Sequence, residues 1–181
     1  MKKIILIIGS SLLAITSFAQ DKLITKTGDV KFYSHTEAED ITSHNYKVIS
    51  SLEKSTGKFV FSVPMQSFEL EPALRQKHFN SAKFLDTKQF PKAKFKGNIT
   101  DLSAVDFTKD GVYNVSVAGS LTIHGVTKKV TEKGVVTVKG GKTSAKAMFS
   151  IALGDYGVFF TKGKPSKNIA KTVEITVDVK Y

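Results

Sequence analysis

The sequence predicts an all-β protein, an antiparallel barrel or sandwich of eight or nine short strands. Segments in which apolar and polar residues alternate recur along most of the chain, and clusters of turn residues separate them at fairly regular spacing. Nearly every segment has a single apolar side, so these sides can meet around a common interior. The 181 residues suffice for one domain with a sizeable core, and no repeat or internal boundary divides them.

The N-terminus has the form of an export signal. A basic start precedes an apolar run at residues 4–15, and residues 17–19 (Ser-Phe-Ala) have the small-x-small form of a cleavage site. We therefore expect residues 1–19 to be removed after Ala19, which leaves residues 20–181 in a periplasmic or secreted location. The apolar run is short for a membrane span, and Gln20 stands where a lipoprotein anchor would need Cys.

Charge and cysteine content limit the classes of function. The chain contains no cysteine, so its stability must come from core burial without disulfides. The formal net charge is +11, and almost all basic residues are lysines, with Arg75 the sole arginine. Because nucleic-acid readers favour arginine, we expect no nucleic-acid partner. Scattered lysines solubilise the chain and can attract anionic lipid head groups, so a transient contact with a membrane surface is expected at most.

The first strands precede Pro64. Val30 and Phe32 alternate with polar neighbours, and a polar loop is expected over residues 35–43. Residues 46–52 form a second expected strand, and residues 58–63 a third, in which apolar side chains share one face. Pro64 ends this strand or marks a sheet edge.

The next stretch, residues 66–89, shows no period of two and is here named the lid segment. It contains several aromatic residues among charged ones, and residues 72–77 resemble a short helix with Pro72 at its first position. Aromatic side chains in an irregular segment need an apolar surface to cover. We therefore expect the lid segment to lie over the mouth of the sheet.

Alternation returns after Pro91, first around residues 95–99 and then in residues 111–130. The second region predicts a hairpin folded at His124 and Gly125, because Gly suits a turn position with positive φ. A further strand is expected to end in a turn at the Gly-Gly pair of residues 140–141.

The C-terminal part continues the pattern. Residues 145–153 present apolar side chains on one face, residues 154–157 form a loop, and an apolar run at 158–160 precedes a basic loop at 163–168. The final strand, residues 172–181, alternates most regularly of all.

Four ordered motifs carry a family resemblance. They are residues 57–64 (GKFVFSVP), residues 78–80 (HFN) with Phe84, residues 90–97 (FPKAKFKG) and residues 119–130 (GSLTIHGVTKKV). Together they resemble the YceI-like family of exported, lipocalin-like proteins that bind polyisoprenoid lipids. The chain departs from the family pattern at residues 84–86, which read Phe-Leu-Asp in place of Phe-Phe-Asp, and before Phe32.

The resemblance implies an antiparallel eight-stranded lipocalin-like barrel with an apolar lumen and a helical segment near its mouth. It also implies a lipid ligand with an isoprenoid or other long apolar tail, no catalytic residues and no cofactor. A long tail suits such a lumen because each methylene removed from water contributes about 0.8 kcal/mol. The sequence leaves open whether the interior is a ligand tunnel or a filled core, and whether the protein is a homodimer.

The expected ligand-binding residues are the apolar side chains that fall on the inner face of the strands and in the lid segment. A polar head group could meet basic side chains of the expected helix, although solvated charges on the helix face are the simpler explanation of those residues. The candidate lining residues are Phe32, Phe59, Phe61, Met65, Phe68, Phe79, Phe84, Phe95, Val115, Val117, Phe149, Ile151 and Phe159, and the head-group candidates are Arg75, Lys77 and His78.

Enzymatic activity has weak support in the sequence. The four histidines lack metal-ligand spacing, so no metal site is expected, and no nucleophile elbow or phosphate loop occurs. A triad of Ser120, His124 and Asp155 is open on sequence grounds, because triads are recognised by geometry. His124 is more simply a hairpin-loop residue.

Two non-enzymatic alternatives also stand. The regular final strand, which ends on Tyr181, resembles that of a small outer-membrane barrel with its apolar face toward lipid, although aromatic girdles would be thin in a chain without Trp. A stress-related or surface interaction module with a filled core would carry no lipid.

Overall fold

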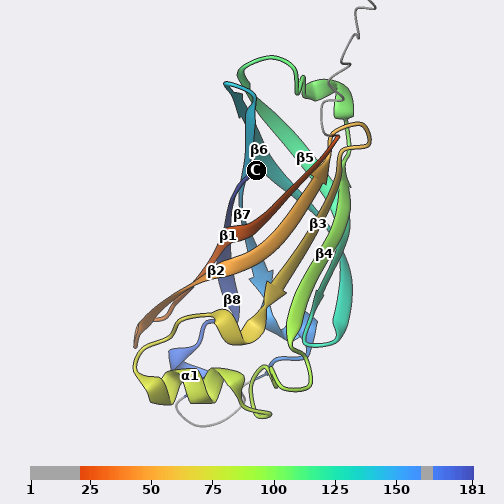
Figure 1. The fold of residues 1–181 in the computed structure, drawn as a ribbon. Helices are drawn as coiled ribbons and strands as arrows, with labels where there is room; N and C mark the ends of the chain where they lie inside the picture. Colours follow the sequence, from red (N-terminus) through yellow and green to blue (C-terminus); the bar gives the residue numbers. More distant parts are fainter. Residues whose placement is uncertain (1–20, 160–164) are drawn as a thin grey trace, which may run out of the picture.

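A computed structural model of the chain describes residues 21–159 and 165–181. Eight antiparallel strands pair in sequence order, and β8 pairs with β1 to close a barrel, which confirms the predicted fold (Figure 1). The expected signal peptide, residues 1–19, lies outside the described residues. The strands are β1 (Lys22–His35), β2 (Asp40–Glu53), β3 (Lys58–Pro64), β4 (Lys92–Ile99), β5 (Gly111–Ile123), β6 (Val126–Lys139), β7 (Lys142–Ala152) and β8 (Thr172–Lys180).

Short helical elements join some of the strands. The helix α1 lies across one end of the barrel, here named the lid end, as the lid segment was expected to do (Figure 1). None of the helices in the described part of the chain is long and apolar enough to cross a bilayer. The elements are the 3-10 turns η1 (Met65–Ser67), η2 (Leu102–Ala104) and η3 (Leu153–Tyr156) and the helices α1 (Ala73–Asn80) and α2 (Pro165–Asn168).

The β5–β6 hairpin folds where the sequence places it. His124 and Gly125 both have positive φ, 50° and 77°, the conformation of a two-residue turn whose twist matches that of the flanking strands. The β6–β7 hairpin turns at Gly140 and Gly141, also with positive φ. Both turn predictions are confirmed, and the period of two in β5 is therefore held in register along the whole hairpin.

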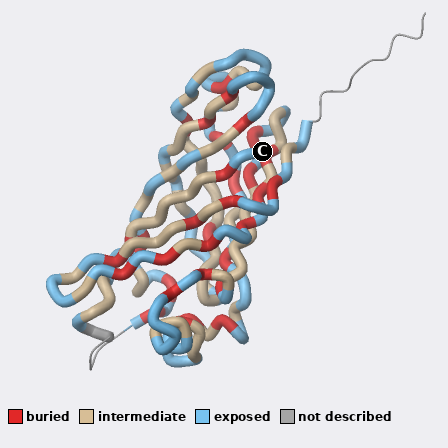
Figure 2. The backbone as a smooth tube through the Cα atoms, turned by 60° about the vertical axis from the view of Figure 1, so that its left-hand side comes forward, coloured by how far each residue is buried: buried red, intermediate tan, exposed pale blue. Residues whose placement is uncertain are grey.

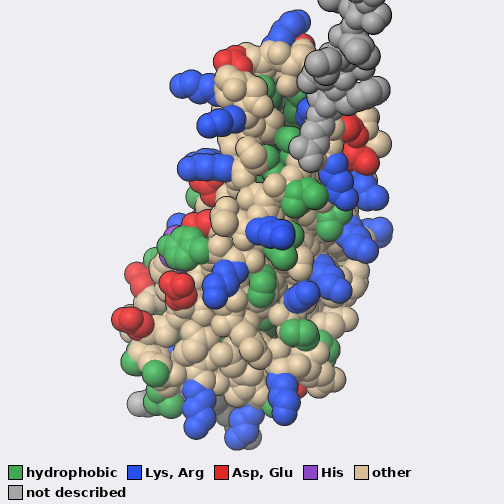
Figure 3. Space-filling model, viewed as in Figure 1, with side chains coloured by type: hydrophobic (Ala, Val, Ile, Leu, Met, Phe, Trp, Pro, Cys, Tyr) green, Lys and Arg blue, Asp and Glu red, His purple; other side chains and the backbone are tan. Residues whose placement is uncertain are grey.

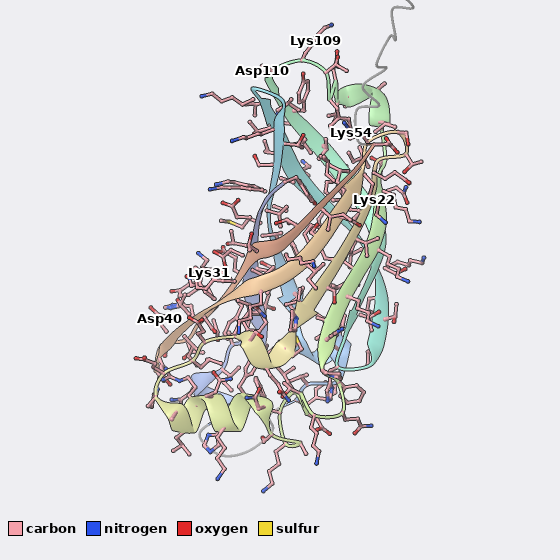
Figure 4. All side chains as sticks on the ribbon, viewed as in Figure 1. Lys22, Lys31, Asp40, Lys54, Lys109 and Asp110 are labelled. Carbon is pink, nitrogen blue, oxygen red and sulfur yellow. The ribbon has the colours of Figure 1, made fainter. Side chains whose placement is uncertain are left out.

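Buried residues alternate with less buried ones along the strands and also occur at both ends of the barrel (Figure 2). Asp40 marks the lid end, and Asp110 marks the opposite, far end (Figure 4). At the far end Leu52, Phe59 and Val136 form a cluster against which side chains of the β4–β5 connection pack. The interior is thus covered at both ends by apolar groups.

The polar loop expected over residues 35–43 was wrong in extent, because β2 already begins at Asp40. Two serines on the inner face explain why the strands continue through this polar sequence. The Ser43 hydroxyl donates to the carbonyl of Glu69 (2.7 Å), and Ser34 Oγ accepts from the amide of Ala170 (3.0 Å). Both serines are buried, and segments distant in sequence satisfy their hydrogen bonds.

Smaller differences occur in the connections. The expected helix at residues 72–77 begins one residue later, with Pro72 as its N-cap, and extends to Asn80. Residues 153–156, expected to begin as strand and continue as loop, form the 3-10 turn η3. The helix α2 covers the end of the basic segment expected as a loop at 163–168, of which residues 163–164 lie outside the described part.

One seam of the barrel is only partly paired. β5 pairs with β6 over its full length, whereas β6 pairs with β7 only from Gly134 to Lys139. Below Gly134 the two strands separate toward the lid end, and η3 lies against both of them. Tyr156 of η3 is only 3% exposed and packs with Ile151 and Val130 at this seam.

Candidate functional site

The inward face of the strands encloses a cavity of about 810 Å³. This volume falls in the range of small-molecule sites in proteins. Its lining is almost entirely apolar and comes from both the barrel wall and the lid segment, so the interior contains a ligand-sized space and is not filled by side chains. Twelve of the predicted lining residues contribute to it, namely Phe32, Phe59, Phe61, Met65, Phe68, Phe79, Phe84, Phe95, Val115, Val117, Phe149 and Ile151.

The position of Phe95 shows how the wall leaves space in the lumen. Phe95 lies opposite Phe61 on β3, with ring centroids 6.3 Å apart, and opposite Leu121 on β5. Gly97 and Gly119 face each other beside it, and a Cβ on either glycine would come within 2.7 Å of the Phe95 ring. The ring therefore lies along the wall over the two glycines, and a larger residue at either position would push it toward the cavity.

Aromatic rings close the cavity at the lid end. Phe32 of β1 stacks on Phe79 of α1 with centroids 5.8 Å apart and planes 5° from parallel. Phe79 also contacts Phe68 and Phe84, each at 5.7 Å between centroids, and is 6% exposed. The lid segment thus docks through a ring cluster whose geometry is typical of favourable aromatic contacts.

The three head-group candidates occupy different environments. Arg75 lines the cavity but its guanidinium already pairs with Glu39 and donates to the carbonyl of Glu71. His78 also lines the cavity, whereas Lys77 is exposed and does not contribute to the lining. The structure therefore places one engaged cation and one histidine at the mouth, and Lys77 outside it.

Phe159 is the predicted lining residue that the structure places elsewhere. Its side chain is 69% exposed and does not line the cavity, whereas its neighbour Val158 is buried in the lid-end core. The backbone turns through η3 and Gly157 immediately before these residues, so Val158 and Phe159 do not continue the inward face of a strand. The assignment of Phe159 to the lumen was wrong for that reason.

Glu132 is a lumen residue that the sequence reasoning missed. It lines the cavity from β6, where it shares the inward face with Val130 and Val136, and it is half-buried. Burial raises the pKa of its carboxyl group, because the apolar surroundings disfavour the charged form. Extending the period of two of β6 through its polar residues would have found it.

The open catalytic alternative has no support in the contacts. Ser120 lies on the outward face of β5, and the ring Nδ1 of His124 lies 3.2 Å from the backbone carbonyl of Tyr156. No hydrogen bond among the described residues joins Ser120, His124 and Asp155. Over the same residues, no group of three or more His, Cys, Asp or Glu side chains is placed to hold a metal ion.

Sequence comparison finds a family model over nearly the whole described chain. The model for the YceI-like domain matches residues 22–181. A UPF0312 protein of Pseudomonas fluorescens is 31% identical over 184 aligned residues, which cover 91% of this chain and 90% of the relative. A UPF0312 protein of Pseudomonas putida is 35% identical over 112 residues, 59% of this chain and 53% of the relative.

Comparison with solved structures supports the same fold. A polyisoprenoid binding domain from Saccharophagus degradans, implicated in plant cell wall breakdown, superposes with a TM-score of 0.74 at 15% identity, covering 89% of this chain and 97% of the other. BcnA of Burkholderia cenocepacia superposes with a TM-score of 0.71 at 19% identity, covering 85% and 96%. At these identities the likeness concerns the fold.

Proposed function

The chain belongs to the YceI-like family, and on that premise we propose that it is an exported protein that binds and carries an isoprenoid-type or other long-chain lipid in its barrel. The observation that carries the proposal is the apolar cavity of about 810 Å³ beneath the lid segment. The polyisoprenoid binding described for the Saccharophagus degradans domain supports the choice of lipid class. The signal-like sequence of residues 1–19 supports export.

The hydrophobic effect is sufficient to hold such a ligand without covalent chemistry. A tail of about ten methylenes moved from water into the lumen gains roughly 8 kcal/mol before the entropic cost of association. The lumen offers rings and branched side chains along its length, so affinity comes from apolar contact area and requires no reaction. Binding, and not catalysis, is the activity that this cavity supports.

The lid end is the side from which a lipid enters, since α1 and the ring cluster of Phe79 are its cover. Leu74 of α1 is 60% exposed there, and the exposed Lys77, Lys83 and Lys88 belong to the same lid segment. Lysine and arginine side chains are present at this end of the molecule and also over the rest of the visible face (Figure 3). This combination suits transient contact with an anionic membrane surface, where the lysines meet head groups and Leu74 meets the apolar layer.

Membrane contact can be tested with matched glutamate substitutions. Leu74→Glu should reduce co-sedimentation with vesicles that contain phosphatidylglycerol, whereas Val112→Glu should not, since Val112 is equally exposed but lies at the start of β5 near the far end. Equal losses for the two variants, or no vesicle binding by the unchanged protein, would contradict docking through the lid end.

The outer surface argues against the outer-membrane alternative. Lys94 and Lys96 are exposed on the outside of β4, while Phe95 between them lines the cavity. A membrane-spanning barrel needs the opposite arrangement, with an apolar band outside. The filled-core interaction module is disfavoured by the cavity itself.

Native mass spectrometry and organic extraction of the purified mature protein test the proposal. We expect a co-purified lipid, or stoichiometric uptake of an added prenyl lipid, by the unchanged protein. Ala147→Leu, which adds volume at a cavity-lining position of β7, should reduce uptake, and Ser150→Leu, at an exposed outward position of the same strand, should leave uptake unchanged. Repeated recovery of lipid-free protein that takes up neither prenyl lipids nor fatty acids would refute the proposed function.

A further inference from the structure

Glu132 places a carboxyl group among apolar side chains in the middle of the barrel wall. Its direct cross-strand neighbour is Val117 on β5, and both side chains line the cavity. Gly134 and Val130 flank it on the inward face of β6. The inward-facing neighbours of Glu132 on β5 and β6 are therefore apolar.

The carboxylate has no recorded partner inside the barrel. Within residues 21–159 and 165–181, no hydrogen bond or ion pair to its oxygens is recorded. Lys133 and Lys146 also border the cavity, but Lys133 is exposed and Lys146 pairs with Asp178 at 2.8 Å. On η3, burial raises the pKa of the Tyr156 phenol, and the charges of Asp155 and then Glu132 add to that shift.

The place of Glu132 along β6 adds a second observation. Pairing between β6 and β7 ends at Gly134 opposite Ala147, and Glu132 is the next inward-facing residue beyond that end. Here the lumen wall continues across the gap through η3 in place of a strand. The wall beside Glu132 is therefore closed by η3 and not by a backbone ladder between β6 and β7.

We infer that Glu132 is the specificity-determining residue of the lumen and accepts a hydrogen bond from a hydroxyl or amine group of a bound long-chain lipid. Glu132 is half-buried in the barrel wall, and a purely hydrocarbon chain would exclude the remaining water from its carboxyl group without offering a hydrogen bond in exchange, which is costly. A lipid that carries an anionic group to this depth would add like-charge repulsion. The lumen therefore selects long-chain alcohols and amines over hydrocarbons and over acids inserted head-first. This inference rests on the proposed lipid-binding function.

The test uses three C20 isoprenoid probes that differ in one group, namely geranylgeraniol, geranylgeranoic acid and the corresponding hydrocarbon. Their affinities are measured by displacement of a fluorescent lipid from the mature protein. We expect the unchanged protein to bind the alcohol at least tenfold more tightly than the hydrocarbon, a difference of about 1.4 kcal/mol.

Three variants separate recognition from folding. Glu132→Gln retains a hydrogen-bond acceptor and should keep the preference for the alcohol. Glu132→Leu should lose it, bind the hydrocarbon at least as tightly as the unchanged protein does, and bind the acid more tightly. Lys129→Gln, at an exposed outward position of the same strand that does not line the cavity, should behave as the unchanged protein. Thermal unfolding of each variant reports whether the barrel is intact, and Glu132→Leu should not be less stable, because it removes a buried carboxyl group without a partner.

The outcomes distinguish this inference from the proposed function. Uptake of all three probes with equal affinity by the unchanged protein, or a preference for the alcohol that survives in Glu132→Leu, would overturn the role of Glu132 alone. Uptake of none of the probes would overturn the lipid-binding function and this inference with it.

Discussion

The substitution Val117→Asp tests whether the inner face of β5 is the lumen face. Val117 lines the cavity directly opposite Glu132, so the substitution removes an apolar side chain and places a second carboxyl group beside the first. Loss of the half-buried valine costs about 1 kcal/mol. Two charges about 5 Å apart repel by about 3 kcal/mol at an effective dielectric constant near 20.

The loss of stability from charge repulsion has an upper bound, because the introduced aspartate can bind a proton and become neutral. Protonation of an aspartate with an ordinary pKa near 3.9 costs about 4 kcal/mol at pH 7. We therefore expect a total loss of about 3 to 4 kcal/mol at pH 7, which lowers the melting temperature by about 10 °C for a chain of this length. The introduced carboxyl has a raised folded-state pKa, so the loss grows as pH rises above about 4 and fades toward that pH.

The matched control is Ser116→Asp on the adjacent, outward position of the same strand. It places the carboxylate opposite Lys133, and we expect a change within about 0.5 kcal/mol. Calorimetric melting at pH 7 and pH 4.5, with lipid uptake measured on the same samples, compares the two. An unchanged melting temperature for Val117→Asp, or a larger loss for Ser116→Asp, would mean that β5 has the opposite face inward.

Two further predictions concern turn geometry and alkaline pH. Gly125→Ala should destabilise the fold by about 2 kcal/mol or more, because φ is 77° and the new Cβ would lie 2.6 Å from the Phe90 ring. The control Gly140→Ala, at φ 55° with no atom within 4 Å of the new Cβ, should cost about 1 kcal/mol. Equal losses of unfolding free energy for the two variants in urea would contradict the contact with Phe90. Burial raises the pKa of Tyr181 to about 12, and the 2.6 Å hydrogen bond to Ser50 partly opposes that shift. The free energy of unfolding therefore keeps the full contribution of Tyr181 below pH 10 and falls by roughly 2 to 3 kcal/mol as pH rises from about 10 to about 12. Tyr181→Phe should flatten that decline in unfolding free energy, and a tyrosinate absorbance titration with an ordinary midpoint near 10 for this residue would refute the burial argument.

Local sequence was sufficient for most strands and turns, because their signals act within a few residues. The alternation in β5 and β8 assigns each side chain to a face once one face is buried. The glycines at positions 125 and 140 identify tight turns from backbone sterics alone. The pairing of β5 with β6 and of β6 with β7 follows from these tight turns, whereas the lid segment separates β3 from β4 and a long connection separates β7 from β8.

Prediction failed where distant segments satisfy polar groups or where the backbone leaves the strand. The start of β2 reads as a polar loop, yet Ser43 is buried because the lid segment supplies the carbonyl of Glu69. Phe159 has the composition of a lumen residue, but η3 redirects the chain and leaves it exposed. Arg75 reads as a free head-group cation, whereas Glu39, far away in the sequence, already neutralises it.

Taken by itself, the sequence determined that strands with one apolar side meet around a shared interior, since a period of two and glycine turns depend on local geometry. Only the tertiary structure decided how much of that interior stays empty, because cavity volume depends on how Phe95 lies over Gly97 and Gly119 from neighbouring strands. The partial β6–β7 seam and the place of Glu132 beside it are likewise tertiary facts. The separation of β6 from β7 depends on the packing of η3 against both strands, and the sequence of β6 alone does not predict that packing.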